Sequence, residues 1–275
     1  MNATLAILGT GNMGRALAIA AAKTLSPAQI VLTDPRPEAA RALAAEIGAQ
    51  SVASNDEALE RARIVLLAMK PQQVQGVLAT LGAKLRQYAA DGSPRALVSI
   101  AAGVQLASLR TWSGCTAAEL PLIRLMPNTA CAIGHGQILA CTEDANAPIN
   151  EVCGFLAAAG RISRIPESAM EAGSVVSACA PAFAYIFMEA LADGGVRAGL
   201  SRQDALQFAA QAVQGAAQMV LQGGQSPAAL KDAVCSPAGS TIAGVAALEA
   251  HGLRHAAIDA VWQAYLRTLE MGKPA

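Results

Sequence analysis

The N-terminal part of the chain alternates short, continuous apolar runs with longer stretches whose apolar residues recur at helical spacing. Residues 15–23 and 37–47 have the helical pattern, and the apolar runs are residues 5–8, 30–33, 64–68, 97–100, 123–126, 137–141 and 161–165. Continuous apolar runs separated by helices are typical of parallel strands that are buried on both faces. With right-handed crossovers, the pattern predicts a Rossmann-like, doubly wound α/β domain whose last strands lie at the far edge of the sheet.

Beyond Pro166 the pattern becomes helical throughout, over residues 169–178, 181–198, 202–222, 227–234 and 256–271. Pro181 suits a first helical turn, the glycine pair at 223–224 suits a helix end, and Ser226 suits an N-cap. We therefore expect a Rossmann-like domain over residues 1–165 and an all-helical domain over residues 166–275. The helix face over residues 205–219 is unusually apolar, which predicts that a subunit contact covers it.

Composition supports this picture and excludes several classes of protein. The chain is 53% hydrophobic, 15% charged and 3% aromatic, which is unlike a disordered protein and suits close packing of small side chains. The formal net charge is +0 and no basic stripe stands out, so neither nucleic acid nor an anionic membrane is an expected partner. The apolar start is expected to be a strand rather than a signal peptide, and no transmembrane span is expected.

The cysteines and histidines indicate neither a disulfide framework nor a metal site. The 6 cysteines form no C-x-x-C pair, which favours free thiols in a reducing cytoplasm. The 3 histidines are His135, His251 and His255, and they have no neighbouring partner ligands. We expect no bound metal.

A glycine-rich turn follows the first predicted strand and precedes the first predicted helix. Gly9, Thr10, Gly11, Asn12, Met13 and Gly14 make the pattern G-x-G-x-x-G. In this context the first glycine permits a tight turn, the second lets the backbone approach a pyrophosphate, and the third lets helix and strand pack closely. The N–H groups of the helix start then bind phosphate. A purely structural strand–helix turn is the alternative.

The end of the second predicted strand carries mixed signals about the cofactor. Asp34 suits the ribose diol of NAD, whereas Arg36 suits the 2′-phosphate of NADP, and Thr33 could add a hydroxyl. Pro35 between the two charges turns the chain, so Asp34 could point away from the cofactor. The alternative is that both charges belong to a solvated loop.

Two further strand ends are placed to meet a ligand, because the carboxyl ends of parallel strands face the binding crevice. Lys70 ends the run Ala68-Met69-Lys70 and could meet cofactor or substrate anions. Ala101, Ala102 and Gly103 follow the fourth strand, and their small side chains would let a nicotinamide lie against the backbone. The alternatives are a surface lysine and close packing.

The segment from Ser236 to Gly244 is a small, hydroxyl-rich loop that leads into a helix. Ser236, Gly239, Ser240 and Thr241 offer hydroxyls and backbone N–H groups at one helix start, which is a ready site for a carboxylate. An N-capping turn explains the same residues equally well.

Taken together, the motifs resemble those of the pyrroline-5-carboxylate reductases over nearly the whole chain. The segments that carry the resemblance occur in the family's order: the glycine turn, Met69-Lys70-Pro71, Met126-Pro127-Asn128-Thr129, residues 182–196 and the Ser236–Gly244 loop. The resemblance implies a dinucleotide-binding domain followed by a helical substrate-binding and dimerisation domain. It also implies NAD(P)H-dependent hydride transfer to the cyclic imine of 1-pyrroline-5-carboxylate, giving L-proline in the last step of proline biosynthesis.

The resemblance also implies roles for individual residues. The glycine-turn residues would bind the cofactor phosphates, and Asn55, Ala68, Met69 and Lys70 would contact the ribose and nicotinamide. Gly239, Ser240 and Thr241 would hold the substrate carboxylate and ring nitrogen, with the Thr241 hydroxyl on the nitrogen and Lys70 orienting cofactor and substrate. Ser236 belongs to the same loop, and Glu167 falls where the family has an acidic residue near the site.

The chain departs from the family pattern at three places. Residues 177–180 are Ser-Ala-Cys-Ala instead of a glycine-containing stretch, Ala130 replaces a proline, and Ala238 replaces the first glycine of Pro-Gly-Gly. Alanine at 238 is tolerable if its φ is negative and costs stability or loop shape if its φ must be positive.

The expected cofactor is NADP(H), with NAD(H) as a second cofactor, and the expected assembly is a homodimer or larger homo-oligomer.

Two rival functions remain open. A β-hydroxy-acid dehydrogenase would rely on a lysine in the helical domain, but the only lysines past residue 200 are Lys231 and Lys273, neither in a convincing setting. A non-catalytic NADP-sensing protein would not need the Ser236–Thr241 loop.

Overall fold

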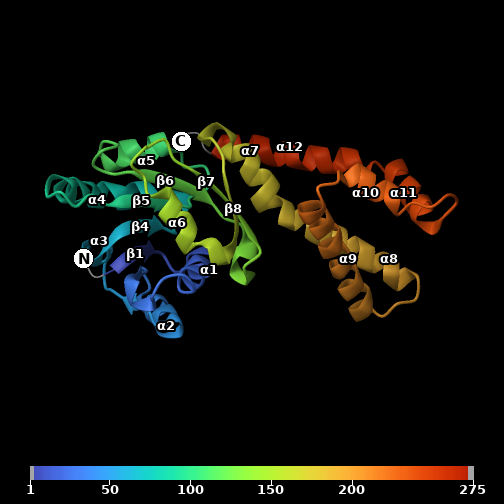
Figure 1. The fold of residues 1–275 in the computed structure, drawn as a ribbon, viewed down its shortest axis with the longest axis horizontal. Helices are drawn as coiled ribbons and strands as arrows, with labels where there is room; N and C mark the ends of the chain where they lie inside the picture. The colour runs from blue at the N-terminus through green and yellow to red at the C-terminus, as the bar shows by residue number, and fades with distance from the viewer. Residues whose placement is uncertain (1–2, 272–275) are drawn as a thin grey trace. The chain divides into compact units, whose positions relative to one another are not determined.

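The computed structural model describes residues 3–271 and divides the chain into two compact units (Figure 1). The first unit runs to Ala178 and takes up the chain again at Arg267, and the second is Cys179–Leu266. The predicted boundary near residue 165 marks the end of the sheet. The first unit extends beyond this boundary, because Met170 is 0% exposed and belongs to the hydrophobic core on one face of the sheet.

An eight-stranded sheet forms the centre of the first unit, with strand order β3-β2-β1-β4-β5-β6-β7-β8. The strands are β1 Ala3–Leu8, β2 Ile30–Thr33, β3 Gln50–Ser51, β4 Ala62–Leu67, β5 Ala96–Ser99, β6 Leu122–Met126, β7 Gly136–Cys141 and β8 Gly160–Arg164. The predicted Rossmann-like fold is confirmed. The order reverses between β1 and β4, and this reversal is where such sheets bind ligands.

Two details of the sheet differ from the pattern in the sequence. β3 is only two residues long and polar, so no apolar run signals it. β7 pairs antiparallel with β6, whereas every other neighbouring pair is parallel. The link from β6 to β7 holds only the short 3-10 helix Thr129–Ile133, and a parallel crossover needs about a dozen residues or more.

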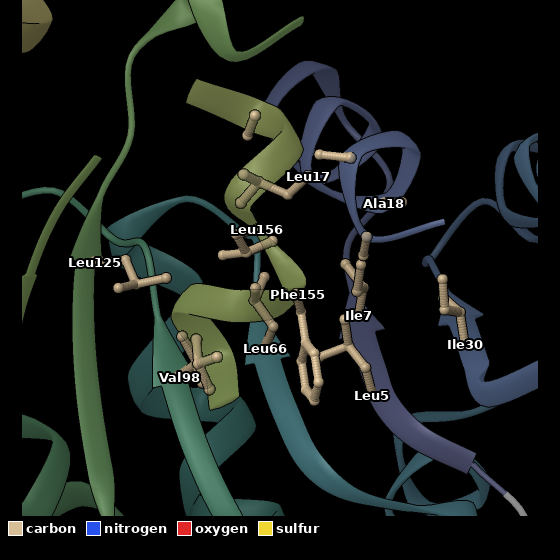
Figure 2. Packing of buried hydrophobic residues seen from close by; sticks show 14 of the residues in the cluster. Leu5, Ile7, Leu17, Ala18, Ile30, Leu66, Val98, Leu125, Phe155 and Leu156 are labelled. Atoms are coloured by element: carbon tan, nitrogen blue, oxygen red, sulfur yellow. The ribbon is translucent and has the colours of Figure 1, made fainter. Parts of the chain in front are cut away.

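Helices cover both faces of the sheet, so successive residues of one strand enter different cores. Leu5 and Ile7 pack on one face with α1 Asn12–Ala21, α2 Pro37–Ile47 and α6 Ile149–Phe155 (Figure 2). Ala6 and Leu8 pack on the other face with α3 Asn55–Arg61, α4 Pro71–Ala90 and α5 Leu106–Ser113. Burial on both faces explains why the strands appear in the sequence as unbroken apolar runs.

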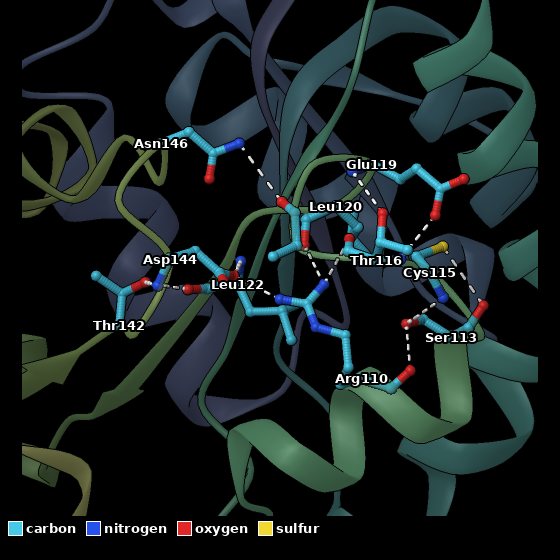
Figure 3. A network of polar contacts seen from close by, with 11 residues as sticks. Arg110, Ser113, Cys115, Thr116, Glu119, Leu120, Leu122, Thr142, Asp144 and Asn146 are labelled. Atoms are coloured by element: carbon cyan, nitrogen blue, oxygen red, sulfur yellow. Dashed lines mark hydrogen bonds and ion pairs between the residues drawn. The ribbon is translucent and has the colours of Figure 1, made fainter.

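A polar network centred on Arg110 closes the loop that follows α5 (Figure 3). The Arg110 guanidinium donates to the carbonyls of Thr116 and Leu120 and to Asp144 Oδ2, the last at 2.5 Å. Asp144 Oδ2 also accepts from the backbone N–H of Leu122 at 2.7 Å. These contacts hold the loop against β6, so this cluster of charges has a structural role.

The cysteines are free thiols, and Cys115, Cys131 and Cys141 are buried. Burial raises the pKa of all three thiols, and that of Cys141 rises to about 11, with nearby Glu167 adding to the effect. These thiols therefore stay protonated at neutral pH and behave as small apolar side chains.

The chain leaves the first unit through a helix with a π-helical turn. α7 Met170–Ser174 continues through the π-turn Val175–Cys179 into α8 Ala180–Arg197. Pro181 has no N–H, so it cannot donate to the carbonyl of Ser177 one turn earlier. The side-chain amide of Asn128 donates to that carbonyl instead, at 2.8 Å. Asn128, in the Met126–Thr129 motif, thus supplies the hydrogen bond that Pro181 cannot give to this irregular helical turn.

The second unit is built from long helices, which confirms the prediction of a helical domain. Its helices are α8, α9 Arg202–Gly223, α10 Pro227–Ala233, α11 Ser240–Ala250 and the part of α12 Leu253–Met271 that precedes Arg267. α8 and α9 pack closely because the small residues Ala192, Ala205 and Ala209 lie between them. Gly224 ends α9 with a φ of 64°, and Ser226 caps α10 by accepting from Ala229 N–H, as expected from the sequence.

Candidate active site

A hollow of about 410 Å³ opens in the first unit beside the carboxyl ends of β1 and β4. The predicted residues in its lining are Gly9, Gly11, Asp34, Arg36, Asn55, Ala68, Met69 and Lys70. It is also lined by Leu8, Pro35, Gln73 and Val77, which were not predicted from the sequence. Their helical spacing is a sequence feature that could have pointed to Gln73 and Val77, because residues four apart near the start of α4 lie on one helix face.

The glycine turn requires glycine at two of its three positions for steric reasons. Gly9 has a φ of +105°, and a Cβ there would lie 2.5 Å from the carbonyl oxygen of Ala68. A Cβ on Gly14 would lie 2.0 Å from the carbonyl oxygen of Gly9. Gly11 differs, because its φ is −64° and a Cβ would meet nothing within 4 Å. The open space next to Gly11 belongs to the hollow.

The start of α1 provides donors for an anion. Gly11 is the N-cap of α1, and the first helical hydrogen bond runs from Arg15 N–H to the Gly11 carbonyl at 2.8 Å. The N–H groups of Asn12, Met13 and Gly14 therefore have no acceptor within the helix. Such a helix start attracts phosphate. Asn12 and Met13 thus have donors available, although their side chains are not part of the lining of the hollow.

Asp34 lines the hollow and also forms hydrogen bonds within the protein. Its Oδ2 accepts from the backbone N–H of Thr10 at 2.7 Å and from the Thr10 hydroxyl at 3.0 Å. Its Oδ1 accepts from the N–H of Arg36 at 3.0 Å. Burial alone would raise the pKa of the Asp34 carboxyl, but the hydrogen bonds from Thr10 and Arg36 lower it below its usual value. Asp34 therefore ties the glycine turn to the end of β2, where Thr33 is itself buried.

Two cationic side chains border the hollow. Arg36 is 69% exposed, and its Nε lies 3.6 Å from Asp34 Oδ1. Lys70 is the exposed N-cap of α4, with Pro71 as the first helical residue. Within residues 3–271, no carboxylate forms an ion pair with Lys70. A cavity with a free helix start and two cations on its border suits a phosphate-bearing dinucleotide.

The small residues after β5 lie outside the lining of the hollow. Ala101 is 2% exposed, Ala102 is exposed, and Gly103 has a φ of 74°. β5 pairs with β4, so this loop follows the strand next to β4, whose carboxyl end leads to Lys70. It is thus at the ligand-facing edge of the sheet.

The hydroxyl-rich loop of the second unit leads into α11. Gly239 is the N-cap of α11, and Ser240 and Thr241 are in its first turn, both exposed. A Cβ on Gly239 would lie 2.3 Å from the Oγ of Ser236 and 3.1 Å from its carbonyl oxygen, so a larger residue would require the Ser236 side chain to rotate away. Part of the predicted loop, from Ser240 to Gly244, is helix. The N–H groups of Ser240 and Thr241 have no acceptor within α11 and can bind a carboxylate.

Ala238 has a φ of 58°, which makes it the non-glycine residue with positive φ among residues 3–271. A Cβ in this region costs roughly 1–2 kcal/mol. We expect Ala238→Gly to raise the free energy of unfolding by about 0.5–1 kcal/mol, because glycine removes the strain but gains entropy in the unfolded chain. Urea unfolding measures this. The control is Ala243→Gly inside α11, which is expected to destabilise by about 1 kcal/mol. A loss of stability in both variants would contradict the strain at Ala238.

Glu167 has partners in the first unit. Its Oε1 accepts from the backbone N–H of Leu106 at 2.7 Å and lies 3.3 Å from Nη1 of Arg124. Glu167 belongs to the first unit, whereas Ser236, Gly239, Ser240 and Thr241 belong to the second. Within the described residues there is no group of three or more His, Cys, Asp or Glu that could hold a metal ion.

Comparisons with known proteins agree with this geometry. The family model described as "NADP oxidoreductase coenzyme F420-dependent" matches residues 4–103. The one described as "Pyrroline-5-carboxylate reductase dimerisation" matches residues 167–271. Pyrroline-5-carboxylate reductase from Synechocystis is 37% identical over 99% of this chain and 100% of its own length. The chain belongs to the pyrroline-5-carboxylate reductase family. The enzyme of that name from Escherichia coli is 34% identical over 99% of this chain and 100% of its own.

Solved structures of the reductase family have the same fold along the whole chain. That of Plasmodium falciparum pyrroline carboxylate reductase, with NADP bound, has a TM-score of 0.85, 28% identity and 99% coverage of both chains. That of the Coxiella burnetii reductase has a TM-score of 0.89, 27% identity and 100% coverage of both chains. The predicted family, fold and NADP-dependent oxidoreductase class are confirmed.

Family membership also explains an apolar helix. By length and composition, the stretch Glu167–Arg197 is the one candidate for crossing a membrane among the described residues. It lies in the region matched by the dimerisation model, and only 11% of its most apolar window is buried within one chain. The dimerisation model supports the expected homo-oligomer, in which a second copy covers apolar surface.

Proposed function

We propose that this member of the pyrroline-5-carboxylate reductase family uses NADPH to reduce the C=N bond of 1-pyrroline-5-carboxylate, and so makes L-proline. The hollow at the reversal of strand order carries the proposal, because Gly11 at the start of α1 lines a space that Arg36 and Lys70 also border. These features fit a dinucleotide phosphate chain. When bound, the cofactor supplies the hydride, and the protein supplies position and electrostatics.

The roles of the protein's own groups follow from their chemistry. Gly11, Asn12 and Met13 bind the pyrophosphate through their N–H groups, Lys70 orients cofactor and substrate, and residues 101–103 line the nicotinamide. In the second unit, the N–H groups and hydroxyls of Ser236–Thr241 hold the substrate carboxylate. The Thr241 hydroxyl contacts the ring nitrogen. A protonated imine is already a strong electrophile, so positioning of the imine carbon suffices and no strong acid is needed.

A direct assay separates this proposal from its rivals. The chain is incubated with NADPH and 1-pyrroline-5-carboxylate, and proline formation and NADPH oxidation are measured. The same chain is then offered NADP⁺ with β-hydroxy acids. Proline formation without β-hydroxy-acid oxidation is expected. Tight NADPH binding without turnover of any substrate would instead support a cofactor sensor.

The position of Asp34 predicts an NADPH preference that depends on Arg36. The Asp34 carboxylate already accepts hydrogen bonds from Thr10, while exposed Arg36 can reach a 2′-phosphate. Arg36→Ala should raise the KM for NADPH at least about fivefold, since one such contact is worth roughly 1–3 kcal/mol. The KM for NADH should barely change. Arg41→Ala, an exposed arginine on α2 outside the hollow, is the control. Unchanged KM values in Arg36→Ala would make it a solvated loop residue.

We propose a homodimer through the helical domain, residues 166–275, as the minimal unit. In the single chain, large apolar side chains of this region are exposed, among them Tyr185, Ile186, Leu206, Phe208, Met219 and Trp262. Static light scattering at micromolar concentration should give the mass of a dimer or a larger assembly. A monomer would contradict the proposal.

The free cysteines further suggest that the enzyme works in a reducing compartment, for which we propose the cytoplasm.

A further inference from the structure

The loop after β5 ends at a helix that is capped by a distant carboxylate. Gln105 is the N-cap of α5, but its side chain makes no capping hydrogen bond. Leu106, the first residue of α5, donates its N–H to Glu167 Oε1 at 2.7 Å, across a sequence separation of 61 residues. A carboxylate at a helix start is favourable, and caps are usually local. Here the cap joins the loop's end to the segment after β8.

A buried arginine holds this carboxylate in place. The Arg124 side chain is 3% exposed, with Nη1 3.3 Å from Glu167 Oε1 and Nη2 2.7 Å from Glu171 Oε1. The two carboxylates are 16% and 13% exposed. An arginine buried this deeply needs its partners, so the orientation of Glu167 is set by a strong structural requirement.

Strand register brings the arginine next to the loop. Ser99, the last residue of β5, is aligned with Leu67 of β4 on one side and with Arg124 of β6 on the other. The Ser99 hydroxyl accepts from the N–H of Ala101 at 3.3 Å. The loop is therefore held by Ser99 at its start and by Glu167 at its end, with Gly103 in a left-handed conformation between them.

We propose that Glu167 is a positioning residue for residues 101–103 and does not bind substrate. The inference rests on the proposed function, in which this loop lines the nicotinamide. The Oε1 of Glu167 is already shared by Leu106 N–H and Arg124. The substrate's own carboxylate would also be repelled by a second carboxylate close to it.

The test compares variants at Glu167 with a matched change at Glu171. Glu167→Ala removes the cap, Glu167→Gln keeps an acceptor for Leu106, and Glu171→Ala removes one partner of Arg124 without touching α5. The dissociation constants of NADPH and of 2′,5′-ADP, which lacks the nicotinamide, are measured by fluorescence and calorimetry. Glu167→Ala should weaken NADPH binding about fivefold, the worth of a typical cap, and leave 2′,5′-ADP binding unchanged.

Glu167→Gln should recover most of the NADPH affinity, and Glu171→Ala should leave it unchanged. If Glu167→Ala does not fold, Glu167→Asp replaces it, since aspartate keeps the charge for Arg124 but falls short of Leu106. An equal loss in Glu171→Ala, or a raised KM for the imino acid with unchanged NADPH affinity, would overturn the proposal. Both affinities are measured without turnover. A wild-type chain that binds NADPH but makes no proline would therefore contradict the proposed function alone.

Discussion

Gly14→Ala is expected to lower the free energy of unfolding by about 2–3 kcal/mol, because the added methyl group overpacks a rigid contact. A Cβ at this position would lie 2.0 Å from the carbonyl oxygen of Gly9 and 3.1 Å from the Cβ of Ala68. Both neighbours belong to strand ends in the middle of the sheet, so neither can move without disturbing the core. Helix α1 would have to shift away from β1. Urea-induced unfolding, followed by circular dichroism, measures the change.

Gly11→Ala is the matched control in the same turn, and a different result is expected from it. The position has an ordinary φ of −64° and nothing within 4 Å of a Cβ, so stability should change by less than about 0.5 kcal/mol. The methyl group would occupy the space proposed for the pyrophosphate, and NADPH affinity should fall at least about tenfold, or about 1.4 kcal/mol. Unchanged NADPH affinity in Gly11→Ala would show that the phosphates bind elsewhere. Equal stability losses in the two variants would contradict the steric argument.

Thr241→Val should lower kcat/KM for pyrroline-5-carboxylate at least about tenfold, or roughly 1.4 kcal/mol of transition-state stabilisation. Valine matches the shape of threonine and lacks only the hydroxyl. Thr241 is exposed in the first turn of α11, and no described residue bonds to its hydroxyl, so the fold should not suffer. The KM for NADPH should change little, because the hollow is lined by residues of the first unit.

Steady-state kinetics with both substrates varied separates the two effects of Thr241→Val. Thr241→Ser restores the hydroxyl and should recover most of the activity, which controls for any effect of the β-methyl group. Full kcat/KM in Thr241→Val would remove the residue from the site and leave the Ser236–Thr241 loop with the role of a helix start only.

Much of the fold could be predicted from the sequence, because the features concerned are local. Strands that are buried on both faces are largely apolar along their length. A run such as residues 30–33 can therefore be recognised as a strand without knowing which strands it pairs with. The glycine turn is equally local, since a tight strand–helix connection needs its glycines within six residues. Glycine and serine at the ends of α9 and α10 likewise act on the helix next to them.

Features that depend on distant segments could not be predicted. The sequence leaves Asp34 open as a ribose ligand, and only the approach of Thr10, 24 residues away, shows that its carboxylate is already bonded. The φ of Ala238 is a local feature by contrast, in a turn that the Gly239 N–H closes on the Ser236 carbonyl at 3.0 Å, and the sequence left its sign open.

The sequence by itself determined the Rossmann-like sheet domain, the glycine turn and the family, since each is recognised from short motifs whose residues are close together in the chain. Only the tertiary structure decided that Asp34 accepts from Thr10, that Asn128 completes the π-turn, and that Glu167 caps α5 beside Arg124. The physical reason is the same in all three cases. Each hydrogen bond joins two residues that are distant in the chain and that only folding brings together. The type of one residue does not show which other residue it will contact.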